Sequence, residues 1–162
     1  MKLSRIWPGP GRALRASLIA LVTTVTAVFA VSSPSMAGGE DFYFDCSNSW
    51  ASCQTGVLVS APGGLPCGTA STIYHSTGVC IRYDGDYVYV RDGQADGYAA
   101  MAFISSSGSS ITYRICRNNQ GYGTWVRCNF DWSESETKYV DGGYKKDYYD
   151  GYGQFLWSFS GN

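Results

Sequence analysis

The sequence predicts a small all-β domain that is stabilised by disulfides and preceded by an export signal. Beyond the N-terminal region, β-branched and aromatic residues alternate with polar ones, and turn residues interrupt them roughly every 8 to 12 positions. The six cysteines are even in number and include no C-x-x-C pair, which favours three disulfides. We therefore expect an antiparallel meander that forms a two-layer sandwich or a partly open barrel, with a helical signal peptide before it.

The first 37 residues have the three parts of a secretory signal. Residues 1–15 hold four cations and no acid, residues 16–31 are almost entirely apolar, and residues 35–37 (Ser-Met-Ala) place small side chains before a cut. The apolar run is shorter than the roughly 20 residues that span a bilayer. We expect a cleaved leader over residues 1–37, one domain over residues 38–162, and a secreted, extracellular protein that is free of the membrane after cleavage.

Removal of the leader makes the protein acidic. Four of the 12 Lys and Arg residues lie in the leader, so eight remain against 13 Asp and Glu, which gives a formal charge of −5. Such a domain has no basic surface for phosphate backbones or anionic lipids. We expect neither nucleic acid nor a membrane as its main partner, and we expect no cofactor.

The strands are predicted from their alternation and from the turns between them. Residues 38–48 are acidic, with Phe42, Tyr43 and Phe44 as their apolar content, and predict a first edge strand. Residues 60–68 hold both prolines of the mature chain and predict a surface loop held at Cys67. Further strands are predicted at residues 56–60, 72–75, 79–83, 86–91, 98–104, 110–117, 124–131, 137–140 and 154–159.

The best-defined unit is a hairpin over residues 79–92. Asp84-Gly85 favours a two-residue type I′ turn, in which both residues take positive φ. With this turn as the loop, Cys80 faces Tyr89 on the less buried side, and we expect Cys80 to pair with a strand or loop from the N-terminal segment. Four aliphatic side chains share the other face, which we assign to the core: Val79, Ile81, Val88 and Val90.

Two more hairpins bend at small residues. Residues 105–109 (Ser-Ser-Ser-Gly-Ser) separate one pair of strands, and residues 118–123 turn the next. If the second turn is symmetric, Cys116 lies opposite Cys128, so we predict a disulfide between them. The connectivity of the other four cysteines stays open: Cys46, Cys53, Cys67 and Cys80.

Residues for catalysis are few, and we assign none. His75 is the only histidine, no Gly-x-Ser-x-Gly elbow is present, and paired cysteines supply no thiolate. Asp131, Glu134 and Glu136 lie close together, and we interpret them as a solvated acidic loop. The alternative is a small hydrolase that uses Asp131 or Glu134 with His75.

One segment resembles the start of a calcium-binding loop. Asp92 and Asp96 occupy ligand positions, but Gln94 stands at the third position and Phe103 replaces the terminal glutamate. We interpret the segment as a turn or bulge and assign no metal site, with Asp92 and Asp96 as the candidates if calcium binds.

The last quarter of the chain is rich in tyrosine. Residues 139–144 and 148–153 repeat a Tyr and Asp-Gly pattern at a spacing of nine, followed by an aromatic strand. Tyrosine combines a flat apolar ring with a polar hydroxyl, which suits stacking on sugars or contact with a protein. The alternative is that these rings only cover one face of a sheet. The candidate binding residues are Tyr144, Tyr148, Tyr149, Tyr152 and Trp157.

Two resemblances concern the middle of the chain. Residues 87–92 (Tyr-Val-Tyr-Val-Arg-Asp) with 95–97, 116–118, 121–125 and 128–129 resemble uncharacterised small secreted actinobacterial proteins that contain cysteines. That resemblance implies secretion and no particular activity. The strand that begins at Val88, followed by Tyr98, also resembles bacterial SH3-type wall-binding domains, although Gln94 stands where their proline is usual.

Three functions follow as hypotheses. The first is a non-catalytic extracellular module that binds cell-wall polysaccharide or a surface protein through the tyrosine-rich face. The second is a secreted inhibitor of an extracellular hydrolase, which would present residues 61–68 with Leu65 exposed. The third is the small hydrolase. We favour the first, because disulfides and excess aromatic residues occur without a catalytic set.

Overall fold

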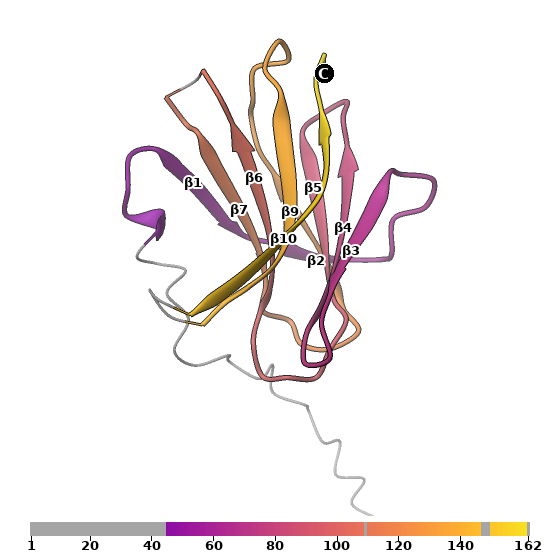
Figure 1. The fold of residues 1–162 in the computed structure, drawn as a ribbon. Helices are drawn as coiled ribbons and strands as arrows, with labels where there is room; N and C mark the ends of the chain where they lie inside the picture. The colour runs from indigo at the N-terminus through magenta and orange to yellow at the C-terminus, as the bar shows by residue number, and fades with distance from the viewer. Residues whose placement is uncertain (1–44, 109, 147–149, 162) are drawn as a thin grey trace, which may run out of the picture. The chain divides into compact units, whose positions relative to one another are not determined.

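The computed structural model describes residues 45–108, 110–146, 150–161 and forms two five-stranded β-sheets (Figure 1). Sheet 1 has the strand order β1-β7-β6-β9-β10, and sheet 2 has the order β2-β8-β5-β4-β3. The predicted all-β, disulfide-stabilised fold is confirmed. The strands are β1 (Ala51–Thr55), β2 (Val57–Val59), β3 (Cys67–Ser71), β4 (Ser76–Arg82), β5 (Tyr87–Asp92), β6 (Ala100–Ser106), β7 (Tyr113–Asn118), β8 (Trp125–Asn129), β9 (Lys138–Lys145) and β10 (Gly151–Phe159).

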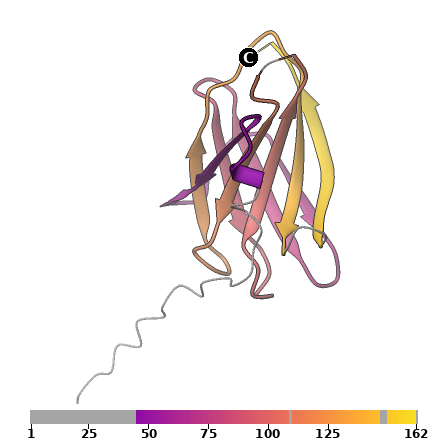
Figure 2. The same cartoon turned by 90° about the vertical axis from the view of Figure 1, so that its left-hand side faces the viewer.

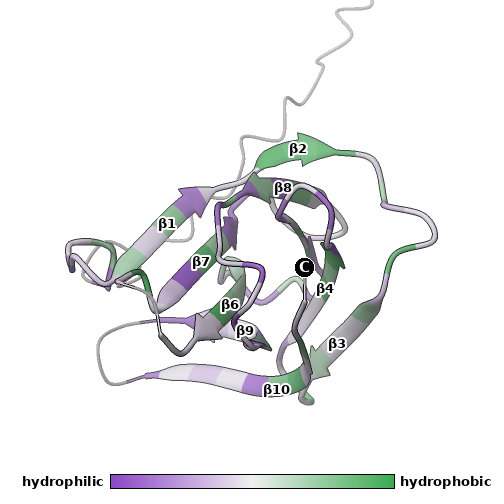
Figure 3. Ribbon diagram, turned by 90° about the horizontal axis from the view of Figure 1, so that it is seen from above, coloured by the Kyte–Doolittle hydropathy of each residue, from purple (hydrophilic) through white to green (hydrophobic). Residues whose placement is uncertain are grey.

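The connections are a meander only in part. Antiparallel hairpins join β3, β4 and β5, β6 to β7, and β9 to β10. The links from β5 to β6, from β7 to β8 and from β8 to β9 each pass from one sheet to the other. One pair of strands, β1 and β7, is parallel. The strands enclose one interior when seen from above (Figure 3).

A glycine lets one edge of the molecule belong to both sheets. β1 pairs with β7 in sheet 1, and β2 pairs with β8 in sheet 2, with only Gly56 between them. The Gly56 amide donates to the carbonyl of Arg117 at 2.9 Å. A Cβ atom on Gly56 would lie 2.5 Å from Cγ2 of Val126. The chain can therefore pass this close to Val126, between β1 and β2, only because residue 56 has no side chain.

The core between the sheets confirms the predicted hairpin register. Val79 pairs with Val90 and Cys80 with Tyr89, as expected. The four aliphatic residues of that hairpin are fully buried in the main cluster together with Ile104, Val126 and Val140. The turn itself differs from the prediction, because positive φ occurs at Gly85 and Asp86 and not at Asp84.

All six cysteines form disulfides, as predicted, which fits an oxidising compartment. The Cys116–Cys128 pairing is confirmed, but it does not close a hairpin, because β7 lies in sheet 1 and β8 in sheet 2. This bridge therefore ties the two sheets together through the core. The pairs left open by the sequence are Cys46–Cys53 and Cys67–Cys80.

Cys80 differs from its prediction in two ways. Its side chain is buried, and its partner Cys67 lies on the neighbouring strand β3, not in the N-terminal segment. The predicted loop at 60–68 therefore ends earlier, where β3 begins at Cys67. Residues 72–75, predicted as a strand, form the turn between β3 and β4 instead.

The beginning of the described chain also departs from the prediction. Residues 45–50 form a helical turn and further turns, not an edge strand, and β1 follows at Ala51. Figure 2 shows this helical turn in front of the strands of sheet 1. The rest of the predicted edge strand and the leader lie outside the described residues. Among the residues that the structure describes, no helix is long and apolar enough to span a membrane.

Sheet 1 carries a second, smaller hydrophobic cluster. Met101, Phe103 and Ile115 are buried in it, and the Cys46–Cys53 disulfide and Tyr113 pack against them. These residues belong to β6 and β7, and their neighbours along the strands point into the main core. Side chains therefore pack on both faces of sheet 1, with the main core on one face and the second cluster on the other. The candidate site lies beside this second cluster.

Candidate functional site: an aromatic groove on sheet 1

A groove of about 450 Å³ lies beside the second hydrophobic cluster. Aromatic rings, carboxylates and one lysine line it, on strands β6, β7, β9 and β10 and on the helical turn at residue 45. We call it the aromatic groove, and its lining residues are Asp45, Phe103, Tyr113, Asp141, Tyr144, Lys145, Gly151, Tyr152 and Gly153.

The groove brings strands together that are far apart in the sequence. Phe103 on β6 pairs with Asp141 on β9 and with Ile115 on β7. Tyr144 and Tyr152 face each other in the β9–β10 ladder, with ring centroids 6.3 Å apart. The wall is therefore formed by a sheet surface in which β6, β7 and β9 each have a neighbouring strand on both sides and β10 forms the edge.

Gly143 makes the close contact of β9 and β10 possible. A Cβ atom at this position would lie 1.7 Å from the carbonyl oxygen of Tyr152. No side chain fits in that space, so only glycine allows the two strands to approach here. The Asp-Gly-Gly sequence of residues 141–143 lies in the middle of strand β9.

The carboxylates of the groove lie in contrasting environments. Lys145 Nζ is 2.5 Å from Asp45 Oδ2, so this charge is paired. Burial raises the pKa of Asp141 above its ordinary value. Burial, with the negative charges of Asp141 and Asp45, raises the pKa of Tyr113 to about 12. The groove therefore presents acceptors and a neutral phenol between apolar rings.

The predicted binding residues are only partly brought together. Tyr144 and Tyr152 line the groove, while Tyr148 and Tyr149 lie outside the described residues. Trp157 lies elsewhere, because its ring packs against the main core and its Nε1 donates to the Tyr83 hydroxyl at 3.3 Å. The sequence missed the contribution of Asp45, Phe103, Tyr113 and Asp141, because their proximity depends on strand pairing across the sheet.

Tyr144 also contacts the buried histidine. Its ring is stacked on Tyr98 at 5.2 Å and lies 4.5 Å from His75. His75 Nδ1 is 2.6 Å from Asp96 Oδ2, and Nε2 is 2.7 Å from Thr77 Oγ1. This arrangement resembles a nucleophile, base and orienting acid, but His75 and Thr77 are buried. Both ring nitrogens of His75 therefore have hydrogen-bond partners within the protein, which gives this histidine a structural role.

The structure does not bring the residues of the hydrolase hypothesis together. His75 lies near Asp92 at one end of β5, whereas Asp131 lies near Asp86 beyond the other end. β5 itself spans about 16 Å, which exceeds the carboxyl separations that glycosidases use. His75 and the acidic cluster at 131–136 therefore lie at opposite ends of the molecule.

The acidic cluster surrounds two buried cations. Lys138 is fully buried, with its Nζ 5.6 Å from the centre of the Phe159 ring, and burial lowers its pKa. Arg114 is also buried and donates through Nη2 to the Asp131 carbonyl at 2.8 Å. Glu136 lies close enough to raise the pKa of both cations. These contacts give the cluster a structural role.

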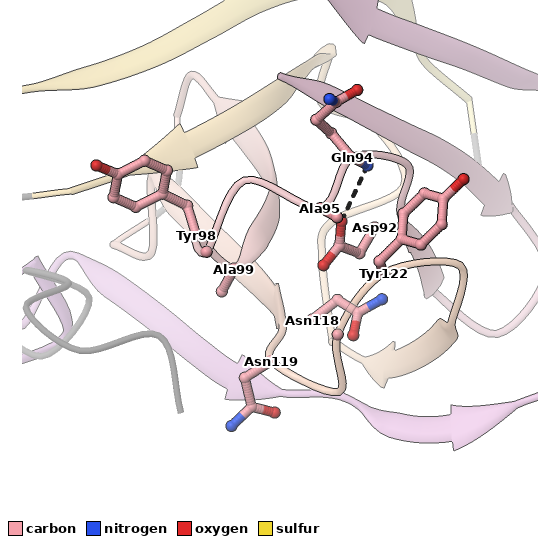
Figure 4. A pocket seen from close by; sticks show the side chains of 10 residues that line it. Asp92, Gln94, Ala95, Tyr98, Ala99, Asn118, Asn119 and Tyr122 are labelled. Carbon is pink, nitrogen blue, oxygen red and sulfur yellow. Dashed lines mark hydrogen bonds between the residues drawn. The ribbon is translucent and has the colours of Figure 1, made fainter. Parts of the chain in front are cut away.

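The two calcium candidates, Asp92 and Asp96, accept hydrogen bonds within the protein. Asp96 uses one oxygen for His75 and the other to accept from the Tyr98 amide at 2.9 Å. Asp92 accepts from the Gln94 amide at 3.2 Å, as Figure 4 shows. Over the described residues, no group of three His, Cys, Asp or Glu side chains could hold a metal ion.

The loop expected of an inhibitor does not present its predicted residue. Leu65 is half-buried, not exposed. Its carbonyl oxygen lies 3.3 Å from the Cys67 sulfur, next to the Cys67–Cys80 disulfide. The most exposed large apolar side chains lie in other segments, including Ile73 and Tyr74 in the β3–β4 turn.

None of the protein-family models, curated proteins or solved structures that were compared with this chain matches it.

Proposed function

We propose that the protein is a secreted, non-catalytic binding module that holds a cell-wall polysaccharide in the aromatic groove. One observation carries the proposal: four aromatic side chains and two carboxylates line a single open groove of about 450 Å³. Aromatic faces stack on the C–H faces of sugar rings, and carboxylates accept hydrogen bonds from sugar hydroxyls. Both kinds of group are needed for a ligand that is apolar on its faces and polar at its edges.

A polysaccharide fits the groove better than a protein partner does. The tyrosines are half-buried within the groove and do not project as an exposed aromatic patch. Protein hot spots usually form from aromatic side chains at the centre of a broad interface. A groove that combines aromatic rings with carboxylates instead suits hydroxylated sugar rings. The disulfides and the predicted leader support an extracellular setting for this proposal.

The experiment is co-sedimentation of the purified mature protein with insoluble wall polysaccharide, followed by titration with soluble oligosaccharide fragments of it. Tyr152→Ala should weaken binding about tenfold, because a buried ring contributes roughly 1.5–3 kcal/mol. Tyr139→Ala is the matched control, since Tyr139 lies exposed on β9 outside the groove.

Two outcomes would count against the proposal. The first is that the wild-type protein does not sediment with any wall polysaccharide. The second is that the two tyrosine variants weaken binding equally, which would indicate contact with the general surface and not with the groove.

A further inference from the structure

The outer face of sheet 2 carries cations, although the chain is acidic once its predicted leader is removed. Along each strand of this sheet, the residues that alternate with the core residues lie on the outer face. Among those residues, none is Asp or Glu in the five strands as the structure describes them. The net charge, from which no basic surface was expected, therefore averages over a local cationic face. Its charged and aromatic residues are Arg82, Tyr87, Tyr89, Arg91, Trp125 and Arg127.

A cavity of about 220 Å³ opens on this face beside Arg91. We call it the Arg91 cavity. It is smaller than the cavities that hold drug-sized ligands, so it suits one ring or one acidic group of a longer ligand. Around Arg91, its walls include Pro62, the Cys67–Cys80 disulfide, Thr69, Ser76 and Trp125.

Gly78 leaves room in the sheet surface for this cavity. It pairs with Thr69 on one side and with Arg91 on the other, and Arg91 pairs in turn with Trp125. A Cβ atom on Gly78 would lie 3.2 Å from Cβ of Arg91 and 3.7 Å from Cη2 of the Trp125 ring. The stem of Arg91 and the Trp125 ring therefore lie close together beside bare backbone, with the hydroxyl of Thr69 on the neighbouring strand.

The guanidinium of Arg91 is available to a ligand. Of the described residues that line the cavity, Arg91 is the only cation, and its side chain is exposed and forms no ion pair within the described chain. Arg127 pairs with Tyr89, and its guanidinium lies 4.7 Å from the centre of the Tyr87 ring, on the side away from Arg91. One unpaired guanidinium can form two parallel hydrogen bonds with one carboxylate.

The other walls combine an aromatic ring with hydroxyl groups. Trp125 is half-buried, so part of its ring remains accessible from the cavity. Thr69 is exposed and Ser76 is half-buried, and each brings a hydroxyl that can donate or accept a hydrogen bond. Aromatic rings stack on the C–H faces of sugars. Together with Arg91, these groups suit a hydroxylated ring that carries one acid.

We propose that the Arg91 cavity binds a uronic acid residue of an acidic polysaccharide. The carboxylate pairs with the guanidinium of Arg91, and the sugar ring lies against Trp125. Nucleic acid fits less well, because phosphate backbones are bound by several cations along the strand, whereas one guanidinium lines this cavity. The cavity lies on sheet 2 and the aromatic groove on sheet 1, so the proposal does not depend on the function assigned to the groove.

The probe is trigalacturonate, titrated into the 15N-labelled mature protein at pH 7.5 and low salt. We expect saturable chemical-shift changes at the Gly78 amide and at the indole N–H of Trp125. Arg91→Gln should weaken binding at least about tenfold, because it removes a charge-assisted pair. Arg91→Lys should weaken it less, since it keeps the charge and loses the planar fork. Arg91 is exposed, so both variants should fold, and their thermal transitions check that.

Arg82→Gln is the matched control and should bind like the wild type. Arg82 is an exposed arginine of the same face that lies outside the cavity, at the end of β4. Equal weakening by Arg82→Gln and Arg91→Gln would overturn the proposal, because it would indicate general attraction to the cationic face. Shifts confined to residues 151–153 would overturn it as well, since the probe would then occupy the aromatic groove.

The second control changes the ligand and leaves the protein intact. The methyl-esterified trisaccharide keeps the rings and most hydroxyls but carries no charge, and it should bind at least about tenfold more weakly. Equal binding of the ester would contradict a role for the carboxylate. Tighter binding of inorganic phosphate, or of a thymidine oligonucleotide, than of trigalacturonate would contradict the choice of a uronic acid as the ligand.

Discussion

At the scale of single residues, Asp92 should oppose folding at neutral pH. Burial raises its pKa to about 6 from an ordinary value of 3.8, so the folded protein holds this proton more tightly than the unfolded chain does. The stabilisation that comes with the proton is complete below about pH 4 and is lost as the pH rises through 6.

Asp92→Asn removes the charge and should therefore raise the free energy of unfolding at pH 7.5. The gain should be at most on the order of 3 kcal/mol, since one pKa unit corresponds to about 1.4 kcal/mol. Urea unfolding at pH 7.5 and at pH 4 measures it, and the difference from wild type should nearly vanish at pH 4. A variant that is equally destabilised at both pH values would show that Asp92 acts through packing and not through its charge.

At the scale of elements, the chain passes from sheet 1 to sheet 2 at Gly56, and we expect this position to accept no side chain. A Cβ atom there would overlap Val126 on the neighbouring strand, whose side chain is fully buried. Gly56→Ala should lower the free energy of unfolding by about 1–3 kcal/mol, the usual cost of overpacking. Gly63→Ala is the control, because nothing lies within 4 Å of a Cβ at that position. Equal stability of the two variants in chemical denaturation would refute this account of the crossing.

The disulfides should differ in their contribution to stability. Cys116–Cys128 joins the two sheets and is buried in the main core, whereas Cys46–Cys53 closes a short loop over sheet 1. Removing a bridge from a small secreted domain costs about 2–5 kcal/mol. The double variant C116A/C128A should lie at the upper end of that range, because it also leaves a cavity. Thermal unfolding of C116A/C128A beside C46A/C53A measures the order, and a larger loss in the second variant would contradict it.

At the scale of the whole molecule, the features that could be predicted from the sequence are those that depend on residues close to one another along the chain. The hairpin of β4 and β5 was predicted in its correct register, since alternation and an Asp-Gly turn are local signals. The Cys116–Cys128 pair was predicted correctly because the two residues are close in the chain. Its role was predicted wrongly, because nothing local distinguishes a hairpin from two strands in different sheets.

The candidate site depends on pairing between distant segments. Tyr144 and Tyr152 were predicted as binding residues because the last quarter of the chain is rich in tyrosine, and both line the aromatic groove. Asp45 and Tyr113 join them only because the helical turn, β7 and β9 meet on one sheet. Trp157 was predicted to lie on the binding face, but its side chain packs against the main core. A register shift between Phe155 and Trp157 interrupts the pairing of β10 with β9 just before this residue. Such a bulge has no reliable signal in one sequence.

The most direct test of the central claim is the location of the bound polysaccharide. We predict that a saturating wall oligosaccharide shifts the backbone amide signals of Gly151, Tyr152 and Gly153 in the 15N-labelled protein. Signals from the β4–β5 turn should remain unchanged. Shifts confined to that turn, with none along the aromatic groove, would contradict the assignment of the groove as the binding site.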